Sequence, residues 1–144
     1  MDKYQKFWSL IDETKTITIL SGAGVSTNSG IPDFRSRGGL YDGIEPEKII
    51  SRKNYNENKK EFWKAYKAIF INKINKKDIR PNIAHEFPKV LKELGKEVYV
   101  VTQNVDGLYD NFVEKEDIIE YHGNISKFKC NGCLNEENSN QLIN

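Results

Sequence analysis

Apolar residues follow two different periods along the chain, and these periods separate the expected helices from the expected strands. Residues 2–13 carry an apolar stripe at helical spacing, and the carboxylate of Asp2 can cap the first turn. The stripe consists of Tyr4, Phe7, Trp8 and Ile11. Runs made mostly of apolar and β-branched residues predict three strands, at residues 16–20, 97–102 and 118–121.

Two longer helices are expected between the first and the second strand. One covers residues 57–71 and is rich in aromatic side chains, which favours packing within a helical subdomain. The other begins after Pro81 and ends at Gly95, since glycine readily adopts the left-handed conformation found at helix C-termini. Pro88 lies inside this helix and should kink it, because proline lacks the N–H that would bond to Ala84.

Three less regular segments complete the expected layout. Residues 21–42 should form a glycine-rich loop with short helical pieces. A short helix is predicted at residues 108–112, between the second and third strands. The polar stretch 135–144 has no clear periodicity and is expected to be frayed or disordered.

The order of these elements predicts an α/β fold with a parallel sheet. Each strand is followed by polar residues, at 21–24, 103–106 and 122–123. In an open parallel sheet, the carboxyl ends of the strands line the ligand crevice. We therefore expect three polar clusters that are distant in the sequence to converge on one binding site.

Composition narrows the class of protein. The chain has 144 residues, enough for one domain, and its net charge of +1 provides no general attraction to nucleic acid or to a membrane surface. No apolar stretch reaches the length of a membrane span, and the amino terminus lacks a signal-peptide pattern. We therefore expect a cytoplasmic protein without nucleic-acid or membrane partners.

The loop after the first strand carries the strongest sign of chemistry. Gly22 and Gly24 follow a strand, where glycine lets backbone N–H groups approach a phosphate closely. Ser26 and Thr27 come next, so the third glycine of the dinucleotide-binding pattern is absent, and an ordinary tight turn is the alternative. The density of functional groups at residues 31–35 favours a binding site over a plain connection.

The second and third strands end in further candidate residues. Asn104 and Asp106 alternate along a strand terminus, so their side chains point the same way and could recognise a ligand carboxamide. An Asx-turn that ends the strand is the alternative. His122 is a candidate general base because its ordinary pKa of about 6.5 suits proton transfer at neutral pH, although a lone histidine is more often structural. His85 is interpreted as a structural or surface residue.

Cys130 and Cys133 form a C-x-x-C motif, which does not amount to a disulfide framework. A structural zinc site usually takes four ligands from two such pairs, so this pair would be half of a site. Two reduced thiols on a loop are the alternative. A redox pair fits less well, because the motif does not open a helix after a strand.

Five motifs, taken together, resemble the sirtuins, which are NAD-dependent protein lysine deacylases. They occur in the family's order and at similar spacing, between about residue 14 and residue 133, and a C-x-x-C pair follows them as in the family. The motifs are 22–26 (GAGVS), 30–36 (GIPDFRS), 81–85 (PNIAH), 102–108 (TQNVDGL) and 122–123 (HG).

The resemblance implies a role for each matching residue. His122 would be the general base and Asn104 would share in catalysis, while the backbone of residues 22–24 would hold the pyrophosphate of NAD. Asp33 and Asp106 would bind the nicotinamide carboxamide. The full set of implied cofactor-binding residues is Gly22, Ala23, Gly24, Ser26, Thr27, Asp33, Phe34, Arg35, Gln103, Asn104, Val105, Asp106 and His122, and the implied zinc ligands are Cys130 and Cys133.

The implied reaction moves the acyl group of an acetylated protein or peptide onto ADP-ribose, with NAD consumed as a co-substrate and nicotinamide released. Family members that prefer negatively charged acyl groups carry Tyr-x-x-Arg. Here Tyr66 is followed by Ile69 at that spacing, which favours a neutral acyl group.

The resemblance also implies that the chain holds only the amino-terminal portion of a sirtuin catalytic core. Residues 1–127 would form a partial Rossmann-like parallel sheet with an inserted helical segment, and residues 128–144 would begin a zinc module. The second C-x-x-C and the later strands are absent, so impaired deacetylase activity is expected. A non-catalytic fragment that binds NAD, nicotinamide or ADP-ribose, and a chain that needs a missing segment to fold, are the alternatives. A nucleic-acid-binding zinc ribbon is the least favoured.

Overall fold

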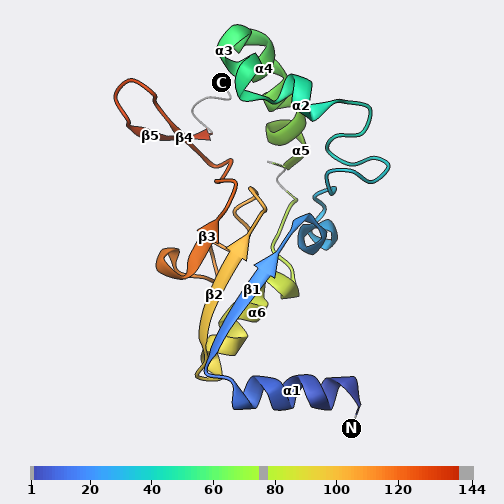
Figure 1. Ribbon diagram of the computed structural model, residues 1–144, viewed down its shortest axis with the longest axis vertical. Helices are drawn as coiled ribbons and strands as arrows, with labels where there is room; N and C mark the ends of the chain where they lie inside the picture. Colours follow the sequence, from blue (N-terminus) through green and yellow to red (C-terminus); the bar gives the residue numbers. More distant parts are fainter. Residues whose placement is uncertain (1, 75–77, 140–144) are drawn as a thin grey trace.

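The computed structural model of the protein describes residues 2–74 and 78–139 and has an α/β architecture (Figure 1). Its helices are α1 (Lys3–Glu13), α2 (Pro46–Ile49), α3 (Arg52–Glu57), α4 (Lys59–Tyr66), α5 (Asn72–Ile74) and α6 (Ile83–Glu93), together with the tighter turns η1 (Ala23–Ser29) and η3 (Lys115–Asp117) and the wider π-helical turn η2 (Lys67–Ile71). Its strands are β1 (Thr16–Ser21), β2 (Glu97–Thr102), β3 (Ile118–Glu120), β4 (Lys127–Lys129) and β5 (Glu136–Asn138). Among the described residues, no helix combines the length and the apolarity needed to cross a bilayer.

The main sheet has the order β1-β2-β3, and both pairings are parallel, which confirms the expected parallel sheet. Ile17 pairs with Val98 and Val100 pairs with Ile118. Side chains alternate across a strand, so these residues share one face. That inner face packs against α6, where Leu91 is fully buried beside Val98.

The opposite, outer face of the sheet exposes apolar side chains. Leu20 and Ile119 are 71% and 61% exposed, and Tyr99 is exposed between them in the order of the strands. The alternation of strand side chains places them on the face that does not meet α6. The sheet is therefore covered on its inner face and carries an apolar surface on its outer face.

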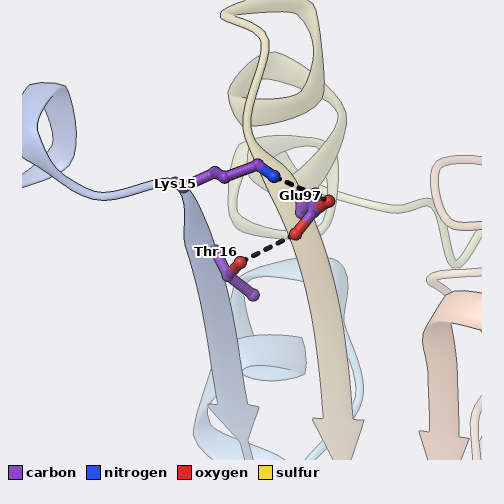
Figure 2. A network of polar contacts seen from close by, with 3 residues as sticks. All are labelled: Lys15, Thr16 and Glu97. Carbon is purple, nitrogen blue, oxygen red and sulfur yellow. Dashed lines mark hydrogen bonds and ion pairs between the residues drawn. The ribbon is translucent and has the colours of Figure 1, made fainter.

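Side chains on the outer face join the amino ends of β1 and β2 (Figure 2). Thr16 Oγ1 donates a hydrogen bond to Glu97 Oε2 at 2.8 Å, and Lys15 Nζ lies 3.8 Å from Glu97 Oε1. Both charged side chains are exposed, so the ion pair contributes at most about 1 kcal/mol. Because Thr16 and Glu97 are paired residues, the hydrogen bond supports the register at the end of the sheet opposite the polar strand ends.

Helix α1 matches its prediction in position but not in packing. Asp2 caps it, accepting hydrogen bonds from the N–H groups of Tyr4 and Gln5. Only Ile11 of the expected apolar stripe is buried, while Tyr4 is 66% exposed and Phe7 and Trp8 are exposed as well. The stripe was predicted from its spacing, which shows which side chains share a face but not whether another element covers that face.

The helical segment between β1 and α6 differs from the single helix predicted at residues 57–71. Asn58 leaves helical geometry (φ −136°), so α3 and α4 are separate helices, and η2 widens the coil after α4. The segment lies beyond the carboxyl ends of the strands (Figure 1). Its buried side chains pack with residues from two loops in one cluster, made of Ile31, Leu40, Ile69, Phe70, Ile74 and Ile125.

Two further expectations are wrong. Residues 108–112 form hydrogen-bonded turns and not a helix. Within the stretch expected to be frayed, residues 136–138 form β5, which pairs antiparallel with β4. Residues 140–144 lie outside the described residues. Helix α6 spans the predicted region with Pro88 buried inside it, and the kink expected there stays a prediction.

Candidate functional site

The carboxyl ends of the three main strands meet at one cavity of about 640 Å³, which we call the central cavity. Ala23 follows β1, Gln103 follows β2 and His122 follows β3. The parallel topology thus brings the three polar strand ends together as expected. The other lining residues are Asp33, Phe34, Arg35, Ser36, Tyr41, Ile50, Tyr66, Phe70, Val105 and Ile125.

The glycine loop turns sharply out of β1 into η1. Gly22 is the N-cap of η1, and its carbonyl accepts a hydrogen bond from the N–H of Val25 at 3.0 Å. A Cβ built at Gly22 or Gly24 would meet nothing within 4 Å, so the space in front of this backbone is open. Such a loop can present backbone N–H groups to an anionic ligand. Thr27 is exposed, and its hydroxyl donates to the carbonyl of Gly24 at 2.9 Å, which supports the turn.

A tight loop at residues 33–41 places Phe34 and Arg35 in the wall of the central cavity. The loop closes through hydrogen bonds from Leu40 N to Asp33 O and from Tyr41 N to Phe34 O, at 2.7 and 2.9 Å. A Cβ at Gly39 would lie 2.7 Å from the Asp33 carbonyl oxygen, so the closure requires glycine there. The buried Leu40 side chain anchors the loop in the hydrophobic core.

The carboxylate of Asp33 has a local partner. It accepts hydrogen bonds from the backbone N–H and the hydroxyl of Ser36. These hydrogen bonds lower the pKa of Asp33, so the side chain is ionised at neutral pH. Asp33 lines the central cavity, whereas Asp106, its implied companion at the nicotinamide, lines a smaller cavity beside it.

Ser26 is the centre of a buried hydrogen-bond network. Its hydroxyl donates to Asp106 Oδ2 at 2.7 Å and lies 3.0 Å from Asn104 Nδ2 and 3.3 Å from His85 Nε2. The shared partner places Asn104 and Asp106 on one side of the chain, as their spacing predicts. The N–H of Leu108 also donates to Asp106 Oδ1, so the Asx-turn offered as the alternative is present too.

His85 belongs to this network, and its side chain is 0% exposed, which agrees with the structural and not with the surface interpretation of this residue. The backbone N–H of Asn82 donates to His85 Nδ1 at 3.1 Å. Nδ1 is therefore an acceptor, and in the neutral ring the proton lies on Nε2, which donates to Ser26. Burial lowers the pKa of His85, against a smaller opposing effect of the Asp106 charge, so the ring is neutral. The capping-box spacing of Asn82 and His85 at the start of α6 was the feature of the sequence that could have indicated a structural role for this histidine.

The side-chain oxygen of Asn104 is a buried acceptor without a partner among the described residues. The only hydroxyl hydrogen of Ser26 is directed to Asp106, so Asn104 must turn its amide nitrogen toward Ser26 and leave Oδ1 unbonded. Asn104 lines the smaller cavity together with Ser26, Phe34, Val105 and Asp106. The volume of this cavity, about 10 Å³, suits one water molecule. An unpaired buried acceptor at this place calls for a water or a ligand donor.

His122 and Gln103 are exposed residues on the rim of the central cavity. The turn after β3 closes through a hydrogen bond from Gly123 N to Glu120 O, and Gly123 has a positive φ of 78°. Glycine tolerates that conformation, which would strain most other residues. An imidazole at this rim is accessible to a substrate and can act as a base.

The apolar part of the central cavity was missed by sequence analysis. Tyr66 and Phe70 lie four residues apart on one side of the helical segment, and their ring centroids are 4.9 Å apart. Their aromatic stripe was interpreted as core packing, and Phe70 does belong to the core. Spacing alone cannot show that such a stripe also borders a cavity.

Cys130 and Cys133 lie in the turn between β4 and β5, and both thiols are exposed. Hydrogen bonds from the backbone N–H groups of Cys133 and Gly132 lower the pKa of Cys130, which favours the thiolate that binds metal. Among residues 2–74 and 78–139, no group of three or more metal-binding side chains occurs. The pair therefore offers two of the four ligands that a structural zinc ion takes.

Comparison with known proteins identifies relatives of this chain. The family model described as "Sir2 family" matches residues 22–144. An NAD-dependent protein deacetylase of Bacillus cereus (strain ATCC 10987 / NRS 248) is 43% identical over 134 residues, which is 92% of this chain and 54% of that protein. NAD-dependent protein deacetylase 2 of Geobacillus kaustophilus (strain HTA426) is 39% identical over 139 residues, 94% of this chain and 55% of that protein. The chain thus spans about half the length of the curated relatives it matches.

Solved structures agree with the sequence relatives. One described as "Sir2-p53 peptide-NAD+" superimposes with a TM-score of 0.77 and 31% identity, covering 99% of this chain and 55% of that one. Another, "Structure of Sir2Tm bound to a propionylated peptide", gives a TM-score of 0.76 and 30% identity, covering 99% and 54%. The family match, the curated relatives and the shared fold establish that this chain belongs to the Sir2 family.

Proposed function

We propose that this protein is the amino-terminal part of an NAD-dependent protein lysine deacylase and that its substrate is an acylated lysine of a protein or peptide. The observation that carries the proposal is the central cavity, where the glycine loop, Gln103 and His122 meet at three strand ends. The printed names of the relatives, and the p53 and propionylated peptides named with the neighbouring structures, support the same substrate class.

The residues present fit the parts of NAD. The open backbone at Gly22 and Gly24 suits the pyrophosphate, with Ala23 between them, and Arg35 adds a positive charge in the cavity wall. The unpaired Oδ1 of Asn104 suits a hydroxyl donor of the nicotinamide ribose or an ordered water, and Gln103 lies nearby on the cavity rim.

We place the nicotinamide ring at the side of the central cavity that adjoins the smaller cavity. Asp106 and Val105 line that cavity, and the carboxylate can accept from a carboxamide NH₂. Since the cavity has room for about one water, the ring can enter only if a wall residue moves. Phe34 lines both cavities and is the side chain we expect to move.

His122 acts as the general base in this proposal. The acyl carbonyl oxygen attacks the anomeric carbon of the nicotinamide ribose while the bond to the pyridinium nitrogen breaks, and nicotinamide leaves. His122 then accepts a proton from a ribose hydroxyl, whose oxygen attacks the acyl carbon. Water completes the release of the lysine amine, and the products are lysine, nicotinamide and O-acyl-ADP-ribose.

Zinc has no part in these steps. Cys130 and Cys133 would hold a zinc ion as two of its four ligands, and its contribution would be to stabilise the β4–β5 hairpin. We also propose a cytoplasmic location. A net charge of +1 gives no general attraction to nucleic acid or to a membrane surface, so we propose no partner of either kind.

Nicotinamide release from NAD with an acetyl-lysine peptide tests the proposal. We expect release that requires the peptide and falls about 10²- to 10⁴-fold in His122→Ala, the usual effect of losing a general base. Glu97→Gln is the matched control, since Glu97 lies at the opposite end of the sheet and only its surface contacts change. If the protein is folded by circular dichroism and binds NAD without releasing nicotinamide, the proposed enzymatic activity is contradicted. That result would indicate a non-catalytic binding fragment.

A further inference from the structure

We propose that Lys73 is a positioning residue that holds the loop at residues 33–41 in the place where this loop lines the central cavity. The inference rests on the proposed function, because the loop supplies Phe34 and Arg35 to the cavity assigned to NAD. Lys73 belongs to α5, at the end of the helical segment. It is therefore outside the cavity and would act on NAD binding only through the loop.

The side chain of Lys73 reaches the backbone of the loop. Its Nζ donates hydrogen bonds to the carbonyl oxygens of Gly39 and Leu40, at 3.4 and 3.3 Å. A lysine ammonium has three N–H donors, so it can bond both carbonyls at once. Both distances are long for N–H···O bonds, so each bond contributes modestly. The side chain is half-buried, which reduces the competition of water for these bonds.

The two bonded residues are the ones that close the loop. The N–H of Leu40 donates to the carbonyl of Asp33 at 2.7 Å. A Cβ built at Gly39 would lie 2.7 Å from the same carbonyl oxygen, so the two ends of the loop are in close contact. A shift of residues 39–40 would therefore move Asp33 and, with it, Phe34 and Arg35 in the cavity wall.

The remaining contacts of the loop fix its shape more than its place. Asp33 bonds to Ser36, within the loop itself. The buried Leu40 side chain and the rings of Tyr41 and Phe70, 6.4 Å apart, attach the loop to the hydrophobic core. Apolar contacts are non-directional and allow sliding, whereas hydrogen bonds to two carbonyls depend on orientation. Lys73 thus supplies a directional attachment to the helical segment.

A change of Lys73 should alter the affinity for NAD and leave turnover intact. Lys73→Met removes the ammonium and keeps a long unbranched side chain. With NAD and an acetyl-lysine peptide, we expect the KM for NAD to rise about tenfold, equivalent to about 1.4 kcal/mol, while kcat and the KM for the peptide stay the same. A merely structural role would reduce the folded fraction and lower kcat at an unchanged KM.

Two further variants control for charge. Lys73→Arg keeps a cation with several N–H donors and should restore most of the affinity for NAD. Lys64→Met removes the same charge from an exposed position of α4 and should leave the KM for NAD unchanged. The Kd for NAD by calorimetry makes the same comparison without turnover.

An arginine-specific protease provides a readout that needs no NAD. Arg35 and Arg37 lie in the exposed part of the loop, while Arg52 begins α3 and lies outside it. The remaining arginine, Arg80, precedes a proline, where such proteases do not cut. We expect Lys73→Met to be cleaved faster in the loop, relative to cleavage after Arg52, than the wild type. Mass spectrometry of the fragments over time measures this ratio.

The two readouts separate this inference from the proposed function. If Lys73→Met and Lys64→Met gave the same cleavage ratio, Lys73 would not hold the loop and the inference would be wrong, while the proposed function would stand. Faster loop cleavage at an unchanged Kd for NAD would also overturn the positioning role. If the folded wild type neither bound NAD nor released nicotinamide, the proposed function and the role of Lys73 in NAD binding would both be wrong.

Discussion

The hydroxyl of Ser26 uses its full hydrogen-bonding capacity inside the site. It has one hydrogen, directed to Asp106, and two lone pairs, which meet Asn104 and His85. The arrangement fixes the amide orientation of Asn104 and the tautomer of His85 together. A single small polar side chain thus joins three other polar residues in one hydrogen-bond network, of which Asn104 and Asp106 line the smaller cavity.

Because His85 is buried in its neutral form, the fold should lose stability in mild acid. Burial lowers the pKa of His85 below the ordinary 6.5, so below about pH 6.5 the unfolded chain takes up a proton that the folded chain refuses. The contribution of His85 to the free energy of unfolding should therefore be at its full value above that pH. It should decline as the pH falls toward the folded-state pKa of the ring. Urea unfolding at about pH 7.5 and about pH 5.5 measures the difference.

His85→Gln is the comparison, because it removes the titrating ring and keeps a polar side chain. Its stability should decline less between the two pH values than that of the wild type. Glu120, whose pKa is raised by burial, acts in the opposite direction but is present in both proteins. Equal declines in the two proteins would mean that His85 does not titrate in this range.

Sequence analysis found the polar residues of the site more readily than their neighbours. Gly22, Asn104 and His122 were predicted because each follows a strand, and strand ends of a parallel sheet must meet. The contact of His85 with Ser26 was not predicted, since a lone histidine inside a helix gives no sign of a partner 59 positions away in the sequence. Tyr66 was assigned to the core because aromatic spacing is the same for a core and for a cavity wall.

At the scale of elements, the start of α6 holds the glycine loop. The side chain of Asn82 caps α6 by accepting from the N–H of Ala84 at 2.9 Å. Its amide nitrogen donates to the Val25 carbonyl and to Ser29 Oγ, both at 2.8 Å. One residue therefore both begins a helix and fixes the back of the loop assigned to the pyrophosphate.

Two substitutions of Asn82 should separate the helix cap from the contacts with the glycine loop, which we call the tether. Asn82→Ala removes both the cap and the tether, and we expect a loss of about 1 to 3 kcal/mol in the free energy of unfolding. Asn82→Asp keeps an acceptor for the cap but loses the amide donors. Urea titration and the Kd for NAD by calorimetry measure both effects. If Asn82→Asp bound NAD as the wild type does, the tether would be irrelevant to the loop.

The positions of helices and strands were predicted best where the sequence carries a clear pattern of apolar or β-branched residues. The runs that became β1 and β2 were located almost to the residue, because both are rich in β-branched side chains, which favour strands. The helical segment was predicted as one helix, although Asn58 breaks it. β5 was missed because its residues Glu136, Glu137 and Asn138 carry no apolar pattern and are held by backbone pairing to β4.

At the scale of the whole molecule, the sheet has two unlike faces. The inner face packs against α6, and the outer face exposes Leu20, Tyr99 and Ile119. Contiguous exposed apolar surface favours association. A net charge of +1 provides little electrostatic repulsion against it. We therefore expect the chain to self-associate through this face at high concentration.

Ile119→Lys should weaken that self-association. The change removes the apolar side chain, which is 61% exposed, and puts a charge on the β3 side of the face while leaving the inner packing intact. Sedimentation velocity over a range of concentrations should show a larger monomer fraction than in the wild type. Thr18→Lys adds the same charge to an exposed position of the same face without removing large apolar surface. If both variants gained equally, added charge and not lost apolar surface would explain the effect, and the expected role of the exposed apolar side chains would be wrong.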